Sequence, residues 1–292
     1  MAMLFDREAT LDDVREDARE LLQGAIDVHV HFSPDPYAER RMYADDLVAR
    51  AVEAGMGGLV LKSHEYNTQP LAWLLDRQHE SIRVYGGIAL DHGVGGLNME
   101  AVSVAMLIGT TVVWMPTFDA QAWRDARPGG RHSPAPGITV LDEMGDLRHE
   151  VMAILDLIGE HDAVLATGHL STPEVAVLGR EARRRGIRTV VTHGSFYITV
   201  EVQQELASLG AYIEQVATAT SHEDGQEQFE LIESQVRAVG PGQVILSTDF
   251  GQERNPEPPV GFGRWIEHFL DAGYSTSDVS RMVRENPADL IG

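Results

Sequence analysis

The feature that most constrains the fold is a regular alternation of two kinds of segment along the chain. Eight short apolar runs recur, and a segment with helically spaced apolar residues follows each of them. The runs are continuously apolar, which is typical of parallel strands that are buried on both faces of a sheet. Eight such units are the number that closes a (β/α)8 barrel. We therefore expect an α/β protein with strands at 24–30, 57–63, 83–90, 110–116, 163–169, 188–193, 211–217 and 243–249.

The segments between these runs predict the outer helices of the barrel. An open, doubly wound sheet is the competing fold. Its dinucleotide-binding form needs a glycine-rich turn after the first strand, and HFSPDP at 31–36 is not such a turn. The barrel is therefore favoured, with helices expected at 44–55, 68–80, 98–107, 148–160, 173–185, 200–208, 226–238 and 262–272.

Two additions to the simple barrel are expected. About the first 20 residues predict an extra amino-terminal helix before the first strand. Residues 117–147 include the stretch RPGGRHSPAPG and predict a long loop over the active-site end of the barrel. We find no linker composition, so we expect residues 1–292 to form a single barrel domain.

Charge and composition exclude several classes of partner. The formal net charge is −22, which disfavours binding to nucleic acid or to an anionic membrane surface. The chain has no cysteine, so it can form neither a disulfide nor a thiolate metal site. We expect no secretory signal and no membrane span, and hence a cytoplasmic protein that acts on a small molecule. The sequence leaves a homo-oligomer open.

Polar side chains that can bind a metal close several of the expected strands. His29 and His31 are two apart at the end of the first run, so they share one side of the strand. His169, His193 and Asp249 end the fifth, sixth and eighth runs. A single histidine at such a place is more often structural, but this joint pattern favours a metal site at the carboxyl ends of the strands. Imidazole and carboxylate ligands suit Zn²⁺, and they also suit manganese or iron.

This set of residues resembles that of the amidohydrolase superfamily of metal-dependent TIM-barrel hydrolases. The resemblance covers residues 24–292, including the closing segment Asn286-Pro287-Ala288. It implies that His29, His31 and Asp249 bind a first metal and that His169 and His193 bind a second. It also implies that Asp249 takes a proton from the attacking water.

Lys62 is where the sequence departs from this family. Binuclear members usually supply a bridging carboxylated lysine or a glutamate from the fourth strand, which here ends in Trp114-Met115-Pro116-Thr117. Lys62 ends the second run and is the only lysine in the chain. A carbamate forms only on a neutral amine, and arginine cannot supply one. We expect Lys62 to be the carboxylated bridge, with an unmodified functional amine or a buried structural cation as the alternatives.

Three further polar residues are candidates for substrate binding. His64 lies two residues beyond Lys62, and Asp91 and His92 close the third run. All three should lie near the mouth of the barrel. Glu214 lies within the seventh run, where it would point inward or support a ligand.

The function that follows is hydrolysis by a metal-activated water at an amide, lactone, cyclic imide or ester of a small molecule. The main alternative is a non-oxidative decarboxylase of the same superfamily with a single metal, in which His193 acts on the substrate. A Schiff-base aldolase that uses Lys62 would leave the histidines unexplained. A barrel that binds a ligand without catalysis is the fourth alternative.

Overall fold

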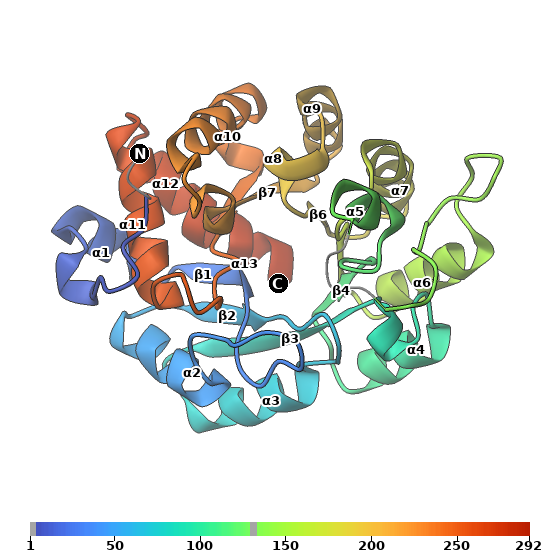
Figure 1. Ribbon diagram of the computed structural model, residues 1–292, viewed down its shortest axis with the longest axis horizontal. Helices are drawn as coiled ribbons and strands as arrows, with labels where there is room; N and C mark the ends of the chain where they lie inside the picture. The colour runs from blue at the N-terminus through green and yellow to red at the C-terminus, as the bar shows by residue number, and fades with distance from the viewer. Residues whose placement is uncertain (1–3, 129–132) are drawn as a thin grey trace.

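The computed structural model describes residues 4–128 and 133–292. Eight parallel strands follow one another around a barrel in chain order, and the helices lie outside them (Figure 1). Each strand pairs in parallel with the next along the chain. The predicted (β/α)8 fold is therefore confirmed, with strands β1 (Ile26–Val30), β2 (Gly58–Leu61), β3 (Arg83–Ala89), β4 (Val112–Trp114), β5 (Val164–Ala166), β6 (Thr189–Val191), β7 (Tyr212–Val216) and β8 (Val244–Ser247).

The barrel closes where the ends of β1 and β8 meet. The amide of Asp249 donates to the carbonyl of His29 at 2.8 Å, and the amide of His31 donates to the carbonyl of Phe250 at 2.7 Å. The buried carboxylate of Asp27 strengthens this seam, because it accepts bonds from the amide and hydroxyl of Thr248 at 3.1 and 2.5 Å. Closure thus joins the first and the last candidate metal ligands through backbone hydrogen bonds.

A helix follows every strand, within a few residues of the expected bounds. Several begin with capping interactions that the sequence signals. Ser171 and Glu174 form a reciprocal capping box, and Asn98 accepts bonds from two amides of the first turn. The main helices are α2 (Ala44–Glu53), α3 (Gln69–Gln78), α4 (Met99–Leu107), α6 (His149–Glu160), α7 (Thr172–Arg184), α9 (Val200–Ser208), α10 (Gly225–Val239) and α11 (Pro258–Asp271).

Both predicted additions are present. The amino-terminal helix α1 (Glu16–Leu22) packs against α11, and the Arg15 amide donates to Glu267 Oε1 at 2.6 Å. The long segment after β4 contains the short helix α5 (Gln121–Ala126), and residues 129–132 of it lie outside the described residues. Short helices α12 (Thr276–Ser280) and α13 (Asn286–Ile291) close the chain. No helix in the described ranges is long and apolar enough to cross a membrane.

The interior of the barrel is filled by side chains, of which the Trp114 indole is the largest. This cluster lies inside the sheet and includes Val28, Val60, Ala89, Val112, Val164, Ala166, Val190 and Ile245. Gly87 on the neighbouring strand leaves room for the indole, because a Cβ there would lie 2.1 Å from Trp114 Cζ3. The ring lies 5.4 Å from Lys62 Nζ. The Trp114 indole therefore packs inside the barrel next to the amine of Lys62.

Replacement of Gly87 by alanine should displace the Trp114 indole. We expect Gly87→Ala to lower the free energy of unfolding by about 1–3 kcal/mol, since the added methyl group overpacks a filled interior. Urea unfolding measures the change, with Gly242→Ala as the matched control because its Cβ meets nothing within 4 Å. Equal stabilities for the two variants would contradict the packing described above.

Candidate metal centre

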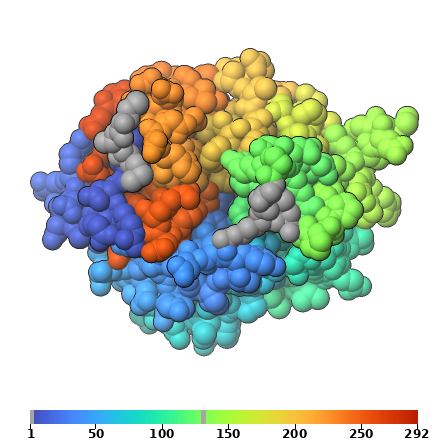
Figure 2. Space-filling view, in the orientation of Figure 1, coloured from blue at the N-terminus to red at the C-terminus, as the bar shows by residue number. Residues whose placement is uncertain are grey.

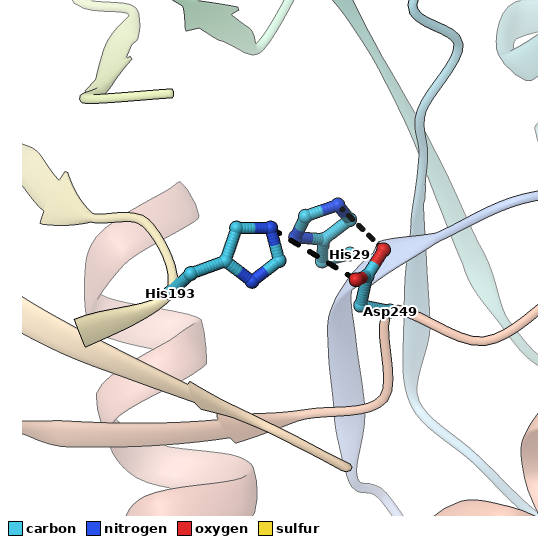
Figure 3. A group of neighbouring side chains, drawn as sticks. All are labelled: His29, His193 and Asp249. Atoms are coloured by element: carbon cyan, nitrogen blue, oxygen red, sulfur yellow. Dashed lines mark ion pairs between the residues drawn. The ribbon is translucent and has the colours of Figure 1, made fainter. Parts of the chain in front are cut away.

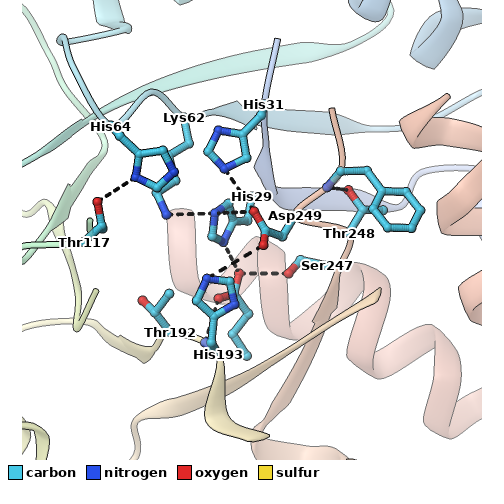
Figure 4. A network of polar contacts seen from close by, with 12 residues as sticks. His29, His31, Lys62, His64, Thr117, Thr192, His193, Ser247, Thr248 and Asp249 are labelled. Carbon is cyan, nitrogen blue, oxygen red and sulfur yellow. Dashed lines mark hydrogen bonds and ion pairs between the residues drawn. The ribbon is translucent and has the colours of Figure 1, made fainter. Parts of the chain in front are cut away.

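Four of the predicted ligands meet at the mouth of the barrel around one carboxylate (Figure 4). Asp249 Oδ1 lies 3.2 Å from His29 Nε2 and 3.0 Å from His31 Nε2. Lys62 Nζ lies 2.9 Å from the same His29 nitrogen. The structure thus brings together groups from β1, from the end of β2 and from the end of β8, as the sequence predicts.

The histidines that follow β5 and β6 complete the ring of ligands. His29, His193 and Asp249 each offer a ligand atom, and these atoms lie within 4.8 Å of one another (Figure 3). His193 Nε2 is 3.9 Å from Asp249 Oδ2. The His169 ring lies 5.0 Å from the His193 ring, between centroids. All five predicted histidine and aspartate ligands therefore surround one space.

Unusual backbone conformations aim these side chains into the barrel mouth. His193 and Asp249 have φ angles of 52° and 51°, in the left-handed region that residues other than glycine rarely adopt. Each such residue costs on the order of 1–3 kcal/mol and is found mainly at functional sites. Gly168 precedes His169 with φ 63°, and a Cβ there would lie 2.3 Å from the Met115 carbonyl oxygen.

Burial shifts the ionisation of the whole group. It lowers the pKa of His31, His169 and His193 well below the usual value, so these rings are neutral, the form that binds metals. Burial also lowers the pKa of Lys62, although nearby carboxylates oppose this shift. Burial raises the pKa of Asp249, against the effect of His29 and Lys62.

The ring nitrogens of this group fit a metal for a specific reason. His31 Nδ1, both ring nitrogens of His169 and His193 Nδ1 are buried and have no hydrogen-bond partner among the residues that the structure describes. Buried polar atoms without partners are rare in folded proteins, because each costs free energy. A cation near His169 and His193 would bind one nitrogen of each ring, so the imidazole and carboxylate donors fit a divalent metal.

The carboxylate of Glu214 on β7 contacts two of the candidate ligands, His29 and His193. Its Oε1 lies 3.0 Å from His29 Nδ1 and accepts a bond from the Ser247 hydroxyl at 2.8 Å, and its Oε2 accepts the His193 amide at 3.2 Å. Burial alone would raise the pKa of Glu214, but the nearby His29 and these bonds lower it to about 2. A carboxylate that holds the second nitrogen of a ligand histidine fixes the tautomer of that ring.

The three candidate substrate-binding residues occupy different positions. His64 lines a cavity of about 810 Å³ together with His31, His169, His193 and Asp249. It also lines a second cavity of about 380 Å³, which contains Asp91 and His92. The Asp91 carboxylate is buried and accepts the amides of Thr117 and Asp119, and His92 Nε2 lies 2.9 Å from the Pro136 carbonyl oxygen. The structure therefore brings only His64 to the metal ligands.

Residues from the segments that follow the strands, which the sequence did not assign to the site, form much of the larger cavity. Arginine and aromatic side chains extend its wall outward from the ligands; they are Arg40, Phe118, Trp123, Arg127, Phe196 and Arg254. In Figure 2 the segments that carry them meet around the middle of the visible face. The guanidinium of Arg127 lies 3.8 Å from the centre of the Trp123 ring. These short segments lack the long periodic patterns that identify the main strands and helices, so the only signal for these residues was the arginine-rich and aromatic composition of the segments after β1, β4, β6 and β8.

The fold and the site define a class, a (β/α)8 barrel with a buried His/Asp cluster at the carboxyl ends of its strands. Residues 24–214 match the model of a family of unknown function, DUF6282, and the chain belongs to this family. A search of curated proteins found no match.

Solved structures with the same fold include several amidohydrolases. One from Pseudomonas aeruginosa has a TM-score of 0.64 at 13% identity and covers 94% of this chain and 98% of its own. One from Burkholderia multivorans with bound zinc has a TM-score of 0.60 at 12% identity and covers 91% of this chain and 98% of its own. These similarities confirm the TIM-barrel fold that the resemblance to amidohydrolases predicted.

The support that Glu214 gives to His29 can be tested directly. We expect Glu214→Gln to weaken zinc binding about 10- to 100-fold, because the ligand ring loses its charged hydrogen-bond partner. Competition with a chromogenic chelator measures the affinity. The exposed Glu201 provides the matched control Glu201→Gln, which should bind zinc as tightly as the protein without a substitution. Unchanged affinity in Glu214→Gln would exclude a supporting role.

Proposed function

We propose that this protein is a metal-dependent hydrolase that cleaves a C–N or C–O bond next to a carbonyl group of a small molecule. The observation that carries the proposal is the convergence of His29, His193 and Asp249 within 4.8 Å. The buried and unpartnered nitrogens of His31 and His169 in the same space support it. The zinc-bound amidohydrolase from Burkholderia multivorans, which has the same fold, is consistent with it.

The residues present fit one or two divalent cations, most simply Zn²⁺, with manganese and iron as alternatives. His29, His31 and Asp249 would hold one ion, and His169 and His193 would hold a second. A divalent cation polarises a substrate carbonyl and lowers the pKa of a water molecule to about 7.

Asp249 is the residue that moves the proton. Its carboxylate accepts a proton from the water as the bond from oxygen to the carbonyl carbon forms. It then donates this proton to the departing nitrogen or oxygen as the old bond breaks.

Lys62 is proposed as the group that joins the two ion sites. Its Nζ lies 2.9 Å from His29 Nε2, and its stem rests near the Trp114 ring. Attack of the neutral Nζ on CO₂ would form an N–C bond as one C=O π bond of CO₂ becomes a carboxylate, and the proton lost from the nitrogen would pass to solvent water. The resulting carbamate would offer two oxygens as further metal ligands. Trp114 occupies the place on β4 from which a bridging group would otherwise come.

A decarboxylase with a single ion is the second candidate, and the charges of the cavity favour considering it. Arg40 lines the cavity with a side chain that is only 5% exposed, and Arg254 lines it farther out. The Arg254 guanidinium suits a carboxylate substrate, whereas the Arg40 guanidinium already pairs with Asp35 at 2.5 Å. Metal content separates the candidates, because the hydrolase with the proposed bridge requires two ions per chain.

Removal of the proton acceptor tests the hydrolase. Protein purified from zinc-supplemented culture should contain two zinc ions per chain by mass spectrometry and should hydrolyse at least one member of a panel of amides, cyclic imides, lactones and esters. Asp249→Asn should lower kcat about 10²- to 10⁴-fold. Asp162→Asn is the matched control, since Asp162 has a similar φ of 51° and an exposed side chain. A panel in which only a carboxylic acid reacts, with one zinc per chain, would favour the decarboxylase.

Carboxylation of Lys62 has its own test. With ¹³C-bicarbonate, the zinc-loaded protein should show one carbamate resonance in its ¹³C spectrum, and Lys62→Arg should lack it because guanidinium forms no carbamate. Loading of metal-free protein should reach two zinc ions only when bicarbonate is present. Two ions without bicarbonate, and no resonance, would leave Lys62 as an unmodified amine.

A further inference from the structure

The imidazole of His64 is held on both faces. One face stacks on Phe118, with ring centroids 3.7 Å apart and an angle of 14° between the planes. The other face stacks on His31 at 4.9 Å and 18°. A ring clamped in this way cannot turn, so its two nitrogen edges keep fixed and different surroundings.

The Nδ1 edge is attached to a buried chain of hydrogen bonds. His64 Nδ1 lies 2.6 Å from Thr117 Oγ1, and this hydroxyl donates to Asp91 Oδ2 (Figure 4 shows the first contact). The other oxygen of Asp91 accepts the amides of Thr117 and Asp119 at 2.7 and 3.0 Å. Burial raises the pKa of Asp91, and the bonds from the Thr117 hydroxyl and the two amides oppose this shift, so three donors favour the carboxylate as an acceptor.

This chain decides which ring nitrogen carries the hydrogen. A hydroxyl has one hydrogen, and Thr117 gives it to Asp91, so Thr117 Oγ1 can only accept from His64. His64 must then carry its hydrogen on Nδ1. Its Nε2 has a free lone pair and can only accept, because the hydrogen bond at one nitrogen sets the state of the other.

The Nε2 edge faces the site. His64 is buried, yet it lines the larger cavity beside His31, His169 and Asp249. Its ring lies between those of His31 and His169, at 4.9 and 6.0 Å. In the described ranges of the chain no hydrogen bond from protein reaches Nε2, so a ligand in the cavity is the group that can meet it.

We propose that His64 Nε2 accepts a hydrogen bond from an N–H group of the substrate, which makes the substrate an amide or a cyclic imide rather than an ester or a lactone. This inference rests on the proposed hydrolase and narrows its substrate class. A buried acceptor discriminates against a ligand that leaves it unpaired. A lactam should therefore bind about 10- to 100-fold more tightly than the lactone of the same ring size.

The state of the ring can be measured on the zinc-loaded protein without turnover. Long-range ¹H–¹⁵N spectra of histidine-labelled protein distinguish the two neutral forms, and His64→Gln identifies the His64 signals. We expect the form with hydrogen on Nδ1. The form with hydrogen on Nε2 would overturn the proposal. A change of Nε2 to the metal-bound range on zinc addition, or zinc lost in His64→Gln, would make His64 a metal ligand and would also overturn it.

The substrate class has a separate measurement. Titration with 2-pyrrolidinone should shift the Nε2 signal of His64, whereas γ-butyrolactone, in which oxygen replaces N–H, should leave it in place. Equal shifts or no shift with both would refute the N–H donor. If the lactam shifts the signal but nothing is hydrolysed, the hydrolase fails and the binding inference stands. If lactones are hydrolysed but 2-pyrrolidinone does not shift the Nε2 signal, the hydrolase stands and the binding inference fails.

The positioning role of Thr117 is tested by a matched pair. Thr117→Val removes the hydroxyl at nearly constant volume, so the His64 ring should lose its preference for hydrogen on Nδ1. The advantage of lactam over lactone should then fall to within about threefold. Thr117→Ser keeps the hydroxyl and should restore both. Equal spectra and equal selectivity in the two variants would show that Thr117 has no such role.

Discussion

The hydrogen bonds that close the barrel between β1 and β8 are the constraint on which the site depends. The amide of Asp249 meets the carbonyl of His29, and the amide of His31 meets that of Phe250. Residues more than 200 positions apart are thereby fixed at the spacing of a sheet. The buried carboxylate of Asp27 adds a hydrogen bond from the Thr248 hydroxyl across the same seam. The grouping of the candidate metal ligands is consequently a property of the closed barrel, and no single segment of the chain contains the site.

Most of the fold, and the grouping of the candidate ligands in space, could be predicted because both depend on simple patterns. Continuous apolar runs identify buried parallel strands, and a polar residue that ends such a run is conspicuous, as His169 and Asp249 are. The wall of the cavity could not be predicted in this way. Trp123 lies on the short helix α5 and Arg254 in the segment after β8, and the course of both segments depends on tertiary contacts. The orientation of His64 was equally hidden, since β2 ends at Leu61 and the ring is then fixed by Thr117 and Phe118, far away in sequence.

The interior shows how one large side chain determines where chemistry can be placed. Trp114 fills the position at the end of β4, and Gly87 on β3 provides the space for its indole. Lys62 instead enters from β2, above the indole and next to His29. The single lysine of a chain rich in arginine therefore lies at a position where its compact amine contacts His29.

The left-handed backbone at His193 and Asp249 has a consequence for the evolution of this barrel. Glycine or asparagine would relax both positions, so the protein is less stable than its architecture allows. A screen for stabilising substitutions would find these two positions early. Each such substitution would also remove a side chain from the mouth of the barrel. At the rim of the barrel, stability and the chemistry of the site thus make opposite demands. The strained conformations of His193 and Asp249 show that the side chains of the site have been kept at the expense of stability.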